Sequence, residues 1–197
     1  MAMLLFLGWQ ALALSVHAEY VNANDLGFVQ QSFGVGVGVD ILNVPIQLGV
    51  QQLTTQAFGT VHQPINQTMI IGQDHLVFPV SLSYRWVPRS KIYIQPSIGV
   101  MVFTPMNSGG PAIDAIHQHL SIIGEPVVQN YKETVSPSIF YKLQFSYRVW
   151  PHWRVSFAKT WSKITSTSSF TYLNQYDVKK ESVFHYDPIS VSVAYHF

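Results

Sequence analysis

The basic side chains are the first candidates for a functional site in this sequence. Their positive charges, if grouped together, could attract an anion. No Lys or Arg precedes Arg85, and three arginines lie beside short polar turns. Strand alternation places four basic residues on inward faces, with no acidic residue expected there: Arg85, Lys142, Arg148 and Arg154. The three arginines either form a basic vestibule, or are solvated at the barrel mouth or paired with Glu19 or Asp25 of the N-terminal segment, and we favour the second interpretation.

Two further groups are weaker candidates for a reactive site. His117 and His119 lie near Asp114 and could bind a metal ion, but this spacing alone is typical of many surface loops. Hydroxyl residues fill positions 165–169, yet no His is near them and no Gly-x-Ser-x-Gly motif is present. We therefore expect no metal, no cofactor and no enzymatic activity.

The composition favours a membrane barrel over a soluble domain. Only 11% of the 197 residues are charged, against about 25% in soluble domains, and 14% are aromatic. No run of about 20 apolar residues could span a bilayer as a helix. Cysteine is absent, which excludes disulfides, and the net charge of +1 gives no sign of nucleic-acid binding. A soluble β-sandwich is the alternative.

The elements that position these residues are strands, because apolar residues alternate with small or polar ones. The alternation is strict over residues 187–197, where Ile189, Val191 and Val193 share one face. The same period recurs at 33–39, 44–51, 78–86, 92–102, 139–149 and 153–158, and the first strand is expected around residues 27–31. Gly34, Gly36 and Gly38 share a face, so we expect another group to approach it closely.

The connections alternate in length. Short turns are predicted at residues 40–43, 87–91 and 150–153, and long loops at 54–75, 104–136 and 165–187, with a short helix over 111–124. This predicts an all-β fold: an eight-stranded antiparallel up-and-down transmembrane β-barrel with short periplasmic turns and long extracellular loops.

Aromatic residues gather beside the short turns, as expected for a girdle at the periplasmic interface. The girdle residues are Tyr84, Trp86, Tyr147, Trp150, Trp153, Tyr195 and Phe197. Lys159 breaks the alternation, because strict alternation from Trp153 points it at lipid. It either turns inward at a bulge or lies high enough to reach the interface.

The N-terminal residues are typical of a secretory signal peptide. Residues 1–18 contain an apolar region and end in Val16-His17-Ala18, which predicts cleavage before Glu19 and a single barrel domain over 19–197. No Lys or Arg precedes the apolar region, so either the amino terminus supplies the charge or the true start lies upstream.

Residues 76–197 resemble the outer-membrane protein W (OmpW-like) family. The resemblance rests on the order and spacing of four short motifs, at residues 78–86, 94–100, 138–150 and 187–197. It implies an eight-stranded barrel with a narrow, largely apolar lumen that passes small hydrophobic compounds across the outer membrane of a Gram-negative bacterium.

On this basis we expect a monomeric, passive channel for small hydrophobic solutes. Its capture surface is predicted at Met101, Phe103, Ile113, Ile116 and Leu120, with sideways release into the bilayer as one route. The expected partners are outer-membrane lipid and lipopolysaccharide, and the barrel-assembly machinery through the C-terminal strand. The alternatives are a non-conducting structural or adhesive barrel whose loops bind partners and, third, a lipid-modifying enzyme.

Overall fold

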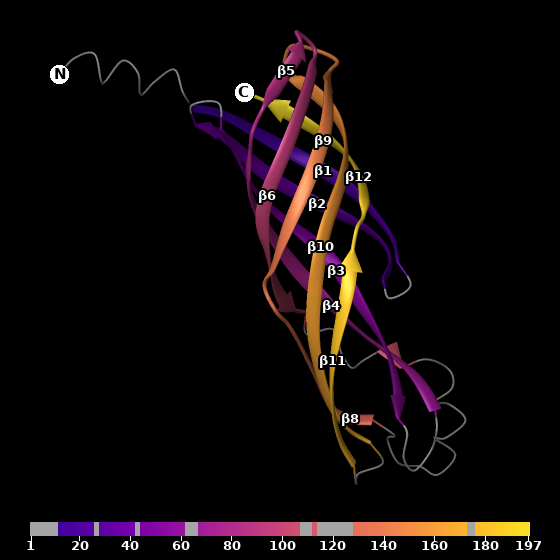
Figure 1. Ribbon diagram of the computed structural model, residues 1–197. Coiled ribbons are helices and arrows are strands. Elements are labelled where there is room, and N and C mark those ends of the chain that lie inside the picture. Colours follow the sequence, from indigo (N-terminus) through magenta and orange to yellow (C-terminus); the bar gives the residue numbers. More distant parts are fainter. Residues whose placement is uncertain are drawn as a thin grey trace, which may run out of the picture.

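The chain forms a closed β-barrel with antiparallel strands (Figure 1). This computed structural model describes residues 12–25, 28–41, 44–61, 67–106, 112–113, 128–172 and 176–197. Eight strands pair in a ring in which the last pairs with the first, which confirms the predicted eight-stranded antiparallel barrel. No helix among the described residues is long and apolar enough to cross a membrane.

The ring and its extensions follow the chain order. The ring strands are β1 (Leu12–Asp25), β2 (Phe28–Ile41), β3 (Val44–Val61), β4 (Gln67–Ser83), β6 (Ile92–Pro105), β9 (Ser138–Arg148), β10 (Trp153–Tyr172) and β12 (Ile189–His196). The shorter strands are β5 (Trp86–Arg89), β7 (Ala112–Ile113), β8 (Val128–Val135) and β11 (Tyr176–Tyr186). β8 continues into β9 across Pro137, and β11 into β12 across Pro188, since proline cannot donate to a ladder.

Two of the predicted long loops are largely strand. The β3–β4 hairpin remains paired out to Val61 and Gln67, and β10 pairs with β11 out to Tyr172 and Tyr176. These hairpins form the lower end of the barrel in Figure 1. Of the helix predicted over 111–124, residues 112–113 are strand β7, and the remainder lies outside the described residues.

The first strand lies earlier in the chain than predicted. Residues 28–31 belong to β2, and the first strand is β1, which pairs with β2 on one side and β12 on the other. Its outward residues are apolar, for example Leu14 and Val16, whereas Ser15, His17 and Glu19 alternate with them. The strand therefore follows the same two-residue period as the rest of the wall.

The predicted cleavage before Glu19 would remove half of β1. Residues 12–18 supply four of the eight pairs that join β1 to β12 and thereby close the ring. Because that loss would halve the ladder that closes the barrel, we expect the mature chain to retain residues 12–18. Intact-mass measurement on protein extracted from membranes tests this expectation, and a mass corresponding to a start at Glu19 would contradict it.

The outer face is apolar between two belts of aromatic residues. The predicted girdle lies at the short-turn end, where the Tyr195 ring lies 5.1 Å from that of Trp153 and 4.9 Å from that of Phe197. A second belt, which the sequence analysis did not identify, contains the cross-strand neighbours Trp161 and Tyr141, and Tyr20 and Phe33. Trp153 and Trp161 are eight positions apart on one strand. That spans about 20 Å along a tilted barrel, close to the height of a typical lipid-facing band.

The glycine-rich face of β2 is approached closely, as predicted. A side chain at Gly36 would overlap the His17 imidazole and the backbone oxygen of Leu48, and one at Gly38 would meet Ser15 Oγ. The glycines therefore make room inside the barrel for the inward side chains of β1.

Candidate functional site: the barrel interior

A bidentate ion pair lies in the barrel interior near the short turns. Arg85 Nη1 lies 2.5 Å from Asp40 Oδ2, and Arg85 Nη2 donates to Asp40 Oδ1 at 3.0 Å. Beside it, the Arg154 guanidinium lies 4.2 Å from the centroid of the Tyr93 ring. The expectation that no acidic residue shares these inward faces was wrong, because β2 reaches Ile41 and turns Asp40 inward.

A second ion pair lies further from the short turns. Lys142 Nζ donates to Glu19 Oε1 at 2.6 Å, and Ser190 Oγ donates to the same oxygen. The Lys142 and Glu19 side chains are only 12% and 16% exposed. Sequence reasoning offered Glu19 as a partner for the arginines, whereas the structure pairs it with Lys142. Its carboxylate enters the lumen because Glu19 lies within β1 and not in an irregular segment before the barrel.

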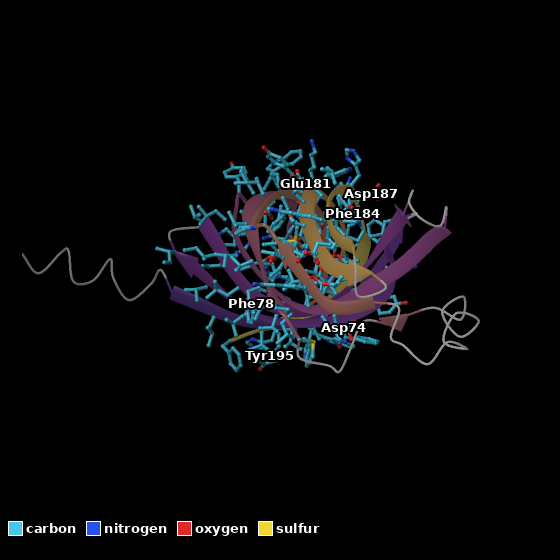
Figure 2. The ribbon with its side chains drawn as sticks, turned by 90° about the horizontal axis from the view of Figure 1, so that it is seen from below. Asp74, Phe78, Glu181, Phe184, Asp187 and Tyr195 are labelled. Carbon is cyan, nitrogen blue, oxygen red and sulfur yellow. The ribbon has the colours of Figure 1, made fainter. Side chains whose placement is uncertain are left out.

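A hydrogen-bonded layer follows the second ion pair. Gln51 Nε2 lies 2.9 Å from Ser32 Oγ and 3.1 Å from Tyr186 Oη, so one side chain links β3 to β2 and β11. All three side chains project into the barrel, and Figure 2 shows side chains filling its middle when seen from the long-loop end. The interior of the short-turn half is therefore polar and cross-linked by hydrogen bonds.

The next layer of the interior toward the long loops is largely apolar, and beyond it the buried side chains include His75, Glu133, Ser166 and Ser168. The buried cluster in the apolar layer consists of Leu53, Val77, Met101, Phe103, Val135, Phe140, Ile164 and Tyr186, with Phe184 packed against it. Met101 and Phe103 are 4% and 9% exposed, so they lie inside the barrel as expected. They pack with their neighbours in this cluster, and Met101 also borders a small cavity.

Two small cavities lie between the interior layers among the described residues. One, with a volume of about 20 Å³, lies beside Arg85 and Asp40, and the other, of about 50 Å³, lies beside Glu19, Lys142 and Met101. A single water molecule needs about 10–15 Å³ measured in this way. The cavities therefore have room for a few water molecules and form no continuous aqueous pore through the described part of the barrel.

The remaining predicted site residues are more dispersed. Arg148 Nη2 donates to the backbone oxygen of Ser90 at 2.9 Å, at the exposed barrel mouth. Lys159 stays on the outer face, where its Nζ lies 2.8 Å from Asp187 Oδ2. Ile113 is in β7, which pairs with β4, whereas Ile116 and Leu120 lie outside the described residues, as do His117, His119 and Asp114.

The barrel wall is incompletely paired in its long-loop half. The β2–β3 ladder ends at Gly34 and Gln51, and the β1–β12 ladder ends at Asn22 and Ile189. Beyond these pairs, the described residues of β1 and β2 pair only with each other. In Figure 1 this hairpin diverges from β3 and β4. The pairing of the wall is thus interrupted beside Gln51, near the level where the polar layers of the interior meet the apolar cluster.

Comparison with solved structures shows the fold of small outer-membrane β-barrels. OprG from Pseudomonas aeruginosa superposes with a TM-score of 0.73 at 13% identity, covering 95% of this chain and 96% of that one. A major outer-membrane protein from Thermus thermophilus gives 0.58 at 11% identity, covering 95% and 100%. The N-terminal barrel domain of P. aeruginosa OprF gives 0.53 at 8% identity, covering 94% and 97%. No family model matches the chain, and no curated protein matches its sequence.

Proposed function

We propose that this chain is a monomeric outer-membrane β-barrel of a Gram-negative bacterium that passively admits small hydrophobic solutes from the long-loop side. The single observation that carries the proposal is the division of its interior. An apolar cluster that includes Met101 and Phe103 lies on the long-loop side of the lumen, with buried polar residues such as Glu133 beyond it, and the short-turn side is closed by ion pairs. An apolar solute would therefore find a favourable environment on one side only.

The ion pairs favour sideways release over passage straight through the barrel. A solute moving toward the short turns would have to separate Lys142 from Glu19 and then Arg85 from Asp40, which leaves buried charges without partners. The wall offers an easier route, because no described pairing joins β2 to β3 beyond Gly34 and Gln51. Release at that level would deliver the solute to the lipid.

Met101→Arg is expected to lower solute entry about tenfold, because it places a charge in the apolar cluster of the lumen. The measurement is uptake of a small apolar fluorophore into proteoliposomes, corrected for protein-free vesicles. Thr104→Arg is the matched control, since Thr104 lies on the same strand but is exposed. Equal uptake by wild type and Met101→Arg would contradict a route through the lumen.

A further inference from the structure

Two basic side chains lie together on the outer wall, just beyond the second aromatic belt. Lys163 on β10 and His185 on β11 are direct cross-strand partners, and both are exposed. Lys163 projects from the same face of β10 as Trp161, two positions earlier. Residues that are cross-strand partners on one face have Cβ atoms about 5 Å apart, so one ligand could contact both side chains.

Nearby carboxylates do not neutralise this pair. The Asp187 carboxylate is held by Lys159 at 2.8 Å. Glu181 lies on the same side of the barrel, but it is four positions from His185 along β11, about 13 Å in an extended strand (Figure 2). Neither Lys163 nor His185 belongs to any of the ion pairs formed among the described residues. The outer wall therefore has unpaired positive charge at this level.

The position of the pair in the wall indicates the kind of anion. Trp161 and Tyr141 are neighbours on the outer face, and an aromatic belt marks the level at which acyl chains give way to headgroups. A phosphate here can accept a charge-assisted hydrogen bond from the Lys163 ammonium and a second hydrogen bond from a ring N–H of His185.

We propose that Lys163 and His185 form a binding site for the phosphate headgroup of an outer-leaflet lipid, whose acyl chain lies against Trp161. The site requires that the barrel span a membrane, which is part of the proposed function, but it does not depend on solute entry. Solute uptake through Met101 can therefore fail while this site remains, and the reverse also holds.

The test is lipid retention by the full-length protein in detergent, read by native mass spectrometry. Phosphatidic acid and phosphatidylcholine with identical acyl chains are supplied in equal amounts. We expect wild type to prefer phosphatidic acid, and Lys163→Gln/His185→Gln to lower that preference about fivefold or more. Lys91→Gln, which removes an exposed lysine from the turn at the opposite end of the barrel, is expected to leave the preference unchanged.

Three results would overturn the proposal. The first is an unchanged preference in the double variant, and the second is an equal loss in Lys91→Gln, which would indicate a response to net charge alone. The third is displacement of phosphatidic acid by excess inorganic phosphate, because this would mean that a free anion suffices and that the acyl chain beside Trp161 contributes nothing. Heat-modifiable migration on a gel verifies that each variant is a folded barrel.

Discussion

Replacing Lys142 with methionine is expected to lower the free energy of unfolding by about 3–5 kcal/mol, because it leaves the Glu19 carboxylate buried without its cation. The two side chains are 12% and 16% exposed, and 2.6 Å separates Lys142 Nζ from Glu19 Oε1. Among the described residues, Ser190 Oγ would remain as a donor to that oxygen, and a neutral hydroxyl replaces little of the lost charge. Urea unfolding in lipid vesicles, followed by tryptophan fluorescence, measures the change.

The double variant Lys142→Met/Glu19→Gln is expected to recover much of this loss, since it leaves no unpaired charge. Lys159→Met is the matched control. It removes a lysine whose partner Asp187 is 54% exposed, and exposed ion pairs typically contribute less than about 1 kcal/mol. If Lys142→Met and Lys159→Met change the free energy of unfolding equally, the interior ion pair is solvated and the barrel is not closed at that layer.

The part of the fold that crosses the lipid-facing band could be predicted because two constraints coincide there. A strand sends alternate side chains to opposite faces, and lipid demands that one of those faces be apolar. Ile94, Ile98 and Val100 on β6 satisfy both constraints, as do Ile189, Val191 and Val193 on β12. The alternation in those strands therefore shows directly which side chains face the lipid and which face the lumen.

Beyond the lipid-facing band, the outward side chains no longer have to be apolar. The outward residues Lys163 and Thr165 of β10 continue a strand without an apolar face, so the Ser- and Thr-rich sequence was interpreted as a loop. β1 was missed for a different reason. Its Leu, Ala and Val residues also suit a signal peptide, although the alternation of Leu14 and Val16 with Ser15 and His17 already indicated a strand.

The interior ion pairs could not be read from the sequence, because their partners are far apart along the chain. Arg85 and Asp40 are separated by 45 positions, and Lys142 and Glu19 by 123. Which inward side chains meet depends on the order of the strands around the ring and on the tilt of each strand. Alternation placed the basic residues inside the barrel, but only the assembled barrel shows which carboxylates they reach.

Gly99→Ala is expected to lower the free energy of unfolding by about 1–3 kcal/mol, because the added methyl group has no space. Gly99 faces inward on β6, and a Cβ there would lie 2.6 Å from Cε1 and Cζ of the Phe140 ring. It would also overlap the backbone oxygen of Val80, which cannot move without disturbing the β4–β6 ladder. The same urea titration measures the loss.

Gly34→Ala is the matched control for Gly99→Ala, because the nearest atom to its Cβ would be the Val50 backbone oxygen at 3.3 Å. That contact is tight but tolerable, and removing a glycine restricts the unfolded chain, so the expected change is within about 1 kcal/mol of zero. Equal effects at both positions would mean that the close approach at Gly99 does not matter. A larger loss at Gly99 would show that the Val80 backbone and the Phe140 ring do not move aside to admit the methyl group. Since Phe140 belongs to the apolar cluster, that result would also mean that any solute entering there must displace a tightly packed side chain.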